Sequence, residues 1–137
     1  MSELPTDIRE HNRKLIEEFR ANKGAGDRPL LLLTTTGART GRRRTTPMMY
    51  VSDGDRLLVI ASNAGASRHP DWYHNLVANP DVTVEVGPET YEATAVVTAG
   101  DERDRLFAGI VEKYPFFADH QAGVSRRIPV VALVRRS

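Results

Sequence analysis

A strong turn signal between two short apolar strands constrains this fold more than any other feature of the sequence. The runs at 45–52 and 56–62 flank Asp53-Gly54, a dipeptide that favours a two-residue hairpin turn. Apolar residues alternate with polar ones at 82–86 and 91–97, on either side of a Gly-Pro turn. Two antiparallel pairs are therefore expected, the second with one buried face.

The remaining elements surround these pairs. Further strands are expected at 30–36 and 128–134, and helices at 6–22, 70–79 and 101–114, with Thr6 or Asp7 as the first N-cap. Because strands and helices do not alternate regularly, a Rossmann domain is unlikely on this pattern. The order favours an α+β fold, a small antiparallel barrel, closed or partly open, with helices at its margins.

The composition limits the chemistry. A chain of 137 residues fits one domain, with residues 1–26 as an amphipathic helix and linker and 27–137 as the barrel. Without cysteine, thiol nucleophiles and thiolate metal sites are excluded. We expect neither a signal peptide nor a membrane span, hence a cytoplasmic protein whose first helix makes at most peripheral membrane contact.

The segment 34–44, Thr-Thr-Thr-Gly-Ala-Arg-Thr-Gly-Arg-Arg-Arg, is the most informative stretch. Its glycines permit a tight turn, and Arg39 and Arg44 can grip a phosphate or carboxylate through paired N–H bonds. The spacing matches neither a Walker loop nor a dinucleotide motif. Solvated surface arginines remain the alternative, and nucleic acid is disfavoured because no aromatic residue interleaves the arginines.

The sequence shows no nucleophilic catalytic group of its own. Its serines lack a GxSxG context, and His69 and His74 lack the partners of a metal site, so no metal is expected. An anion-binding turn without catalytic side chains indicates that a bound cofactor carries the chemistry.

At these residues the chain resembles the deazaflavin-dependent nitroreductase family of actinobacteria. The shared motifs run in matching order from about Leu15 to Val134. They are Leu32–Gly37, Arg39-Thr40-Gly41 with Arg44, Thr46-Pro47, Ser52-Asp53-Gly54, Ala61-Ser62, Pro70-x-Trp72-Tyr73-x-Asn75-Leu76, Ala78-Asn79-Pro80 and Arg127-Ile128-Pro129. The resemblance implies a split β-barrel of the flavin-mononucleotide-binding type and coenzyme F420 as cofactor.

The resemblance also assigns site residues. Those implied to bind the coenzyme are Ala38, Arg39, Thr40, Gly41, Arg44, Thr45, Thr46, Pro47, Met48, Met49, Ile60, Ala61, Ser62, Asn63, Trp72, Tyr73 and Asn75. The turn 38–44 would hold the phosphate, and the segments 47–49 and 60–63 would flank the deazaflavin ring. An aromatic loop at 114–120 would line the substrate side, with Phe116 and Phe117 against the acceptor and Tyr114 or His120 donating a proton.

Two departures from the family pattern modify these expectations. Asn63 stands where many members have lysine, which removes one charged contact to the coenzyme. Phe117 and His120 stand where the nitroimidazole-activating member has tyrosines, so prodrug activation does not follow from the resemblance. The implied reaction is hydride transfer from reduced F420 to a planar acceptor such as a quinone, a nitro compound or an activated alkene.

Alternatives from the same barrel and from other classes stay open at this point. A flavin-mononucleotide or pyridoxamine-phosphate oxidase would share the fold and bind a phosphate-bearing ligand. A non-catalytic anion-binding or nucleic-acid-binding module could use the same arginines. The chain is expected to be a monomer or a homodimer, with Tyr91, Val96 and Val130 offering apolar strand surface for a partner.

Overall fold

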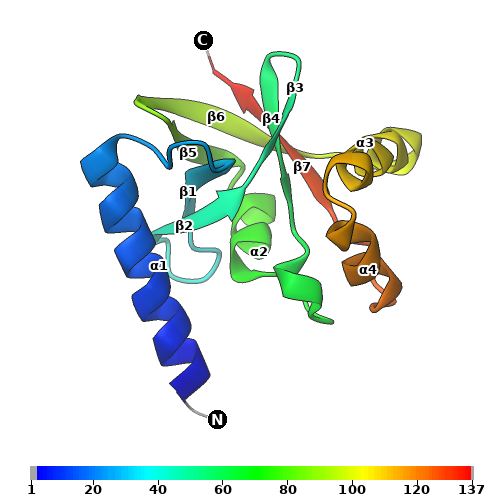
Figure 1. The fold of residues 1–137 in the computed structure, drawn as a ribbon, viewed down its shortest axis with the longest axis horizontal. Coiled ribbons are helices and arrows are strands. Elements are labelled where there is room, and N and C mark those ends of the chain that lie inside the picture. Colours follow the sequence, from blue (N-terminus) through cyan, green and yellow to red (C-terminus); the bar gives the residue numbers. More distant parts are fainter. Residues whose placement is uncertain (1–2, 137) are drawn as a thin grey trace.

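A single seven-stranded antiparallel sheet forms the centre of the molecule, in the order β2-β1-β5-β6-β7-β4-β3. The computed structural model describes the backbone of residues 3–136 and the side chains of residues 9–136. The strands are β1 (Leu30–Thr36), β2 (Arg43–Met49), β3 (Val51–Asp53), β4 (Arg56–Ile60), β5 (Asp81–Val86), β6 (Glu89–Val97) and β7 (Val130–Arg135). The sheet curls until β2 passes close to β4, giving a half-closed barrel (Figure 1).

Helices lie on both sides of this curled sheet. They are α1 (Glu3–Asn22), α2 (Asp71–Ala78), α3 (Gly100–Lys113) and α4 (Phe116–Ala122), with a short 3-10 turn η1 (Asn63–Gly65) before α2. In Figure 1 α1 runs beside β2, while α3 and α4 lie on the opposite side next to β7. None of the helices described within residues 3–136 is long and apolar enough to cross a membrane.

Strand alternation divides the core into two clusters. Inside the barrel, Leu31 and Leu33 of β1 pack with Val59 of β4 and with Leu76, which α2 inserts into the barrel. On the outer face of β4 and β7, the buried side chains pack under α3 and α4. The residues of that second cluster are Leu58, Ile60, Leu106, Ile110, Phe117, Ile128, Val130 and Ala132. The period of two along β4 thus gives each of its faces a separate core.

The strand expected at 45–52 is in fact two strands. β2 begins earlier, at Arg43, and pairs with β1, whereas β3 pairs only with β4 across the Asp53-Gly54 turn. Tyr50 separates them, and its N–H donates to the Pro29 carbonyl at 3.0 Å. One continuous apolar run is therefore divided because its two halves belong to opposite edges of the sheet.

Two helical predictions also need correction. α1 starts at Glu3 rather than at Thr6, so the expected caps Thr6 and Asp7 lie inside the helix. The loop expected at 114–120 is largely helical, since α4 spans Phe116–Ala122 after Pro115. A proline restricts the residue before it but is well suited to the start of a helix, so Pro115 separates α3 from α4.

The apolar surface predicted for a homodimer is only partly present. Val96 is exposed on β6, but Val130 is fully buried under α3 and α4. The ring of Tyr91 is covered by the Arg135 guanidinium, 4.4 Å from its centroid. The three residues therefore do not form one accessible patch.

Candidate functional site

The turn between β1 and β2 is held together by its own backbone and side chains. Gly37 N–H donates to the Arg42 carbonyl at 2.7 Å, and Gly41 N–H donates to the Gly37 carbonyl at 3.0 Å. Arg42 N–H donates to the Thr40 hydroxyl oxygen at 3.2 Å. A Cβ at Gly37 would approach that hydroxyl oxygen to 2.9 Å and the Arg42 carbonyl oxygen to 3.3 Å, so a larger residue would force the turn to shift. Since these N–H groups are already bonded, attraction for an anion comes mainly from the arginine side chains.

Neighbouring arginines of β2 point to opposite faces of the sheet. Arg43 donates to Thr36 Oγ1 at 3.2 Å and to Thr83 Oγ1 at 2.6 Å on the face away from the site. Arg44, one position later, lines a cavity of about 580 Å³ together with Arg39. Successive side chains of a strand point to opposite faces. Arg43 therefore bonds to neighbouring strands of the sheet, whereas Arg44 lines the cavity.

Two further arginines enter this cavity from distant segments. Arg9 comes from α1 and Arg68 from the loop before α2, so four guanidinium groups surround one space. Asp71 lines the same space as an acidic group. Among the side chains of residues 9–136, none of these four arginines is in an ion pair. Such a cluster is suited to a multiply charged anion.

Asn75 connects the arginine turn to α2. Its Oδ1 accepts the Ala38 N–H at 3.0 Å, and its Nδ2 donates to Thr35 Oγ1 at 3.2 Å. The side chain is almost fully buried. Asn75, expected to contact the coenzyme, therefore also fixes the position of the turn relative to α2.

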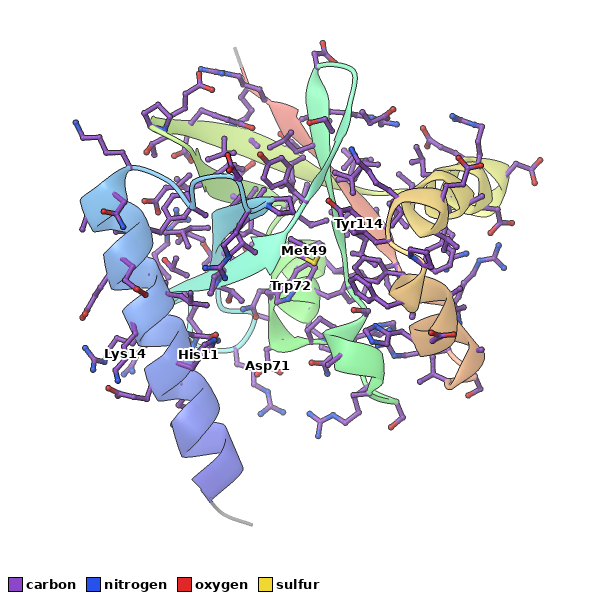
Figure 2. All side chains as sticks on the ribbon, viewed as in Figure 1. His11, Lys14, Met49, Asp71, Trp72 and Tyr114 are labelled. Atoms are coloured by element: carbon purple, nitrogen blue, oxygen red, sulfur yellow. The ribbon has the colours of Figure 1, made fainter. Side chains whose placement is uncertain are left out.

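A second cavity, of about 480 Å³, lies next to the first. It shares Arg9, Arg44, Asp71 and Asn75 with the arginine cavity and is closed on one side by Asn12 and Ile16 of α1. Trp72 lines it from α2. Figure 2 shows Asp71 at the end of α2 nearest α1, with Trp72 beside it toward the middle of the molecule.

Trp72 leads into a third, mostly apolar cavity of about 260 Å³. Met49 and Trp72 face this region from β2 and α2 in the centre of Figure 2. The complete lining comprises Pro47, Met48, Met49, Ile60, Ser62, Asn63, Ala64, Pro70, Trp72, Phe116 and Phe117. Segments expected to flank a flat ring, 47–49 and 60–63, therefore meet here, as does the aromatic pair of α4.

The two phenylalanines of α4 differ in burial. Phe117 is 4% exposed and belongs to the outer core, whereas Phe116 is 41% exposed, with its ring centroid 4.3 Å from that of Phe117. His120 stands edge-on to both rings, at 5.5 and 5.9 Å between centroids. Its buried Nδ1 has no hydrogen-bond partner in the described part of the chain.

Several expected site residues do not line these three cavities within residues 9–136: they are Gly41, Ala61, Tyr73, Tyr114 and His120. Ala61 is fully buried, and Tyr73 packs against the inner core and the ring of His69. Tyr114 lies next to Phe116, with 6.2 Å between ring centroids, at the end of α3 (Figure 2). Conversely, sequence reasoning did not include Arg9 and Arg68, because isolated arginines in a helix and a loop carry no motif.

Comparison with known proteins identifies the family of this chain. The model of the family described as F420H(2)-dependent quinone reductase matches residues 9–135. The chain belongs to this family. F420H2-dependent quinone reductases transfer hydride from the reduced deazaflavin to a quinone-type acceptor, which confirms the predicted enzyme class and cofactor.

Relatives of this F420H2-dependent reductase support the assignment. An F420H(2)-dependent quinone reductase of Mycobacterium tuberculosis (strain ATCC 25618 / H37Rv) is 46% identical over 114 residues, covering 81% of this chain and 76% of the relative. A solved F420-H2 dependent reductase shares 39% identity and a TM-score of 0.71, covering 77% of this chain and 94% of its own. A structure described as a domain-swapped dimer shares 36% identity and a TM-score of 0.73, covering 94% and 98%. The predicted split-barrel fold is thereby confirmed.

The residues of this reductase fit the chemistry of its cofactor. F420 combines a flat deazaflavin ring with an acidic, phosphate-bearing side chain. The cavities offer four guanidinium groups at one end and an apolar space beside Trp72 at the other. Such a pairing of cationic and flat apolar surfaces suits a ligand of this type.

Proposed function

We propose that this chain is an F420H2-dependent quinone reductase whose coenzyme occupies the three adjacent cavities. The observation that carries the proposal is adjacency: Arg44 and Asn75 line both of the first two cavities, and Trp72 lines both of the last two. One ligand with an anionic end and a flat apolar end can therefore contact both. The flavin-mononucleotide and pyridoxamine-phosphate alternatives have no comparable support from family membership.

In this arrangement the arginines hold the charged part of the coenzyme. Arg39 and Arg44, predicted from the sequence, are joined by Arg9 and Arg68 around the same space. Thr45 and Thr46 line the middle cavity, where their hydroxyl groups can bond polar atoms between the phosphate and the ring. The turn itself acts as a rigid support, since its backbone is bonded internally and to Asn75.

The apolar cavity would hold the deazaflavin ring against Met48, Met49 and Trp72. When bound, reduced F420 supplies a hydride to the acceptor, so the protein need only align the two and exclude water. The exposed Phe116 offers a flat surface on which a planar quinone can stack. Tyr114 and His120 remain predicted proton donors; their rings lie next to that of Phe116, and neither residue lines the apolar cavity.

Fluorescence of Trp72, the only tryptophan, tests coenzyme binding directly. Titration with F420 should quench the emission with micromolar or tighter affinity, while flavin mononucleotide and a short oligonucleotide should compete poorly. Oxidation of F420H2 with menadione as acceptor then tests the reaction. Tight binding of flavin mononucleotide with none of F420 would overturn the proposal.

Subunit exchange through α1 is a second proposal, suggested by the relative described as a domain-swapped dimer. α1 is joined to β1 through a segment in which Lys23, Gly24 and Gly26 have positive φ angles. Arg20 near its end is held by Glu85 of β5 through two bonds of 3.1 and 2.9 Å. We infer that a homodimer of this chain would exchange α1 and keep this ion pair across copies. Light scattering after size-exclusion chromatography, with and without residues 1–22, tests this.

Peripheral membrane contact stays a prediction for α1. The positive charge on its basic face is reduced, because Arg13 forms ion pairs with both Glu10 and Glu17. Sedimentation with anionic liposomes at low salt is the direct test.

A further inference from the structure

The loop between β4 and α2 contains a strained turn that forms one wall of the apolar cavity. Asn63, Ala64 and Gly65 have φ angles of 52°, 54° and 82°, so three consecutive residues are left-handed. Side chains with a Cβ rarely adopt this conformation, and it persists only where the surroundings enforce it. Asn63 and Ala64 line the apolar cavity together with Phe116 and Phe117.

One guanidinium group binds the backbone on both sides of this turn. Arg126 donates to the carbonyls of Ala61 at 3.1 Å and Ser62 at 2.8 Å, before the turn. It also donates to the Ala66 carbonyl at 3.1 Å, after the turn. Three bonds from a single planar group fix the distance between the two ends of the turn.

His69 supplies a fourth acceptor for the same arginine. Arg126 Nη1 lies 2.9 Å from His69 Nδ1. Arginine can only donate, so Nδ1 must carry a lone pair and the imidazole must be neutral, with its proton on Nε2. Burial lowers the pKa of His69, and the positive charge of Arg126 and the nearby His74 lower it further. The ring of Tyr73, 4.6 Å away, covers its other side.

The turn also supports the helix that carries the acceptor-side aromatic residues. A Cβ placed on Gly65 would lie 3.3 Å from Cδ2 of His120, so α4 rests directly on this turn. Displacement of Asn63–Gly65 would therefore move both the cavity wall and the position of Phe116.

We propose that Arg126 is a positioning residue for hydride transfer, because it holds the left-handed turn Asn63–Gly65 and thereby sets the width of the apolar cavity in which ring and acceptor meet. The proposal rests on the proposed function for its catalytic part. Hydride transfer depends on close alignment of donor and acceptor, so a displacement of about 1 Å lowers the rate. His69, when neutral, completes the hydrogen bonding of Arg126.

The hydrogen bonds from Arg126 to the backbone on both sides of the turn are called the Arg126 clamp below. Hydrogen–deuterium exchange tests this clamp without any assay of activity. Arg126→Gln is compared with Arg127→Gln, whose side chain is 61% exposed and pairs with Asp104 on the surface. The amides of Gly65 and Ala66, which bond within the turn, should exchange about tenfold faster in Arg126→Gln, as expected from a lost bond to a charged group. Unchanged exchange at 61–69, or equal acceleration throughout the sheet, would overturn the clamp.

Steady-state kinetics then test the positioning role. Arg126→Gln should raise the KM for menadione or lower kcat about tenfold. The Kd for F420 measured through Trp72 should rise by less, because the turn touches only the ring end of the coenzyme and the arginine cavity is unchanged. Arg127→Gln should match the unmodified protein. Equal losses of coenzyme affinity and rate would overturn the proposal. Absence of F420H2 oxidation by the unmodified protein would instead overturn the proposed function, and the exchange data would still decide the clamp.

A pH profile separates positioning from general destabilisation. In the unmodified protein the KM for menadione should rise as pH falls through the pKa of His69, because an imidazolium cannot accept from Arg126. His69→Asn, whose Oδ1 can accept in place of Nδ1, should keep the turn ordered and remove this rise. A rise that persists unchanged in His69→Asn would show that His69 is not the titrating group and would overturn its part in the clamp.

Discussion

Asn75 Oδ1 accepts a hydrogen bond from the Ala38 N–H at 3.0 Å, joining α2 to the arginine turn across 37 positions of the sequence. The same amide donates to Thr35, so both of its polar atoms are used within the protein. The position of Arg39 and Arg44 relative to Trp72 therefore depends on one buried side chain.

Replacing Asn75 with leucine should lower both the unfolding free energy of the protein and its affinity for F420. The substitution leaves the Ala38 N–H and the Thr35 hydroxyl without a partner, which costs about 1–3 kcal/mol of unfolding free energy. Urea unfolding measures this loss. Asn79→Ala is a matched control, because the Asn79 bond to the Thr36 carbonyl is 3.5 Å long and contributes little. Equal midpoints for Asn75→Leu and the unmodified protein would contradict the prediction.

Arg44 and Arg43 provide a paired test of the anion site. Arg44→Ala should weaken F420 binding about tenfold to a hundredfold, the range for a lost bond to a charged group. Arg43→Ala should leave affinity nearly unchanged, because that side chain bonds Thr36 and Thr83 on the other face. Trp72 titrations at low and high salt should show the Arg44 effect shrinking as ions screen the site. Identical losses for the two variants would remove the turn from the site, and Arg39→Ala should behave as Arg44→Ala does.

The two phenylalanines of α4 should separate catalysis from stability. Phe117→Ala opens a cavity in the outer core and should cost about 3–5 kcal/mol of unfolding free energy. Phe116→Ala, at an exposed position beside the cavity, should raise the KM for menadione and change the melting temperature little. Thermal unfolding and steady-state kinetics of both variants check this. If Phe117→Ala instead changed the KM and Phe116→Ala the stability, the acceptor would contact Phe117 and not Phe116.

Acidification should reduce stability through His69. Its pKa lies below the ordinary value of 6.5 in the folded protein, so the unfolded chain binds more protons in the interval between the two values. Unfolding free energy should therefore fall as pH drops below about 6.5 and level off below the folded pKa. Urea unfolding from pH 7.5 to 5 checks this, with His69→Asn as the comparison. The same slope in both proteins would assign the effect to another group.

The sequence predicted the elements better than their connections. Alternation along 82–86 and 91–97 and the turn at Asp53-Gly54 are local patterns, and the corresponding hairpins are present. The pairing of β1 with β5 joins segments about fifty residues apart, and no local pattern specifies it. The division at Tyr50 depends on which sheet edge each half joins, so it too required the tertiary structure.

The candidate site was predictable where chemistry is concentrated in a motif. The arginine turn stood out because four arginines fall within six positions. Arg126 could not be found in this way, because its partners are backbone carbonyls about sixty residues away and any residue supplies a carbonyl. α4 was missed for a different reason: seven residues with mixed polarity are too few to show a helical period.

The two outer strands of the sheet bear on how this protein behaves at high concentration. An uncovered strand offers free N–H and C=O groups to a strand of another molecule, which is a common start of aggregation. β2 carries two arginines and Pro47, which has no N–H to offer, and α1 runs alongside it (Figure 1). β3, at the other edge, is only three residues long. Neither edge strand is both long and uncovered. We therefore expect little polymerisation through strand pairing, even at the high protein concentrations of a cell.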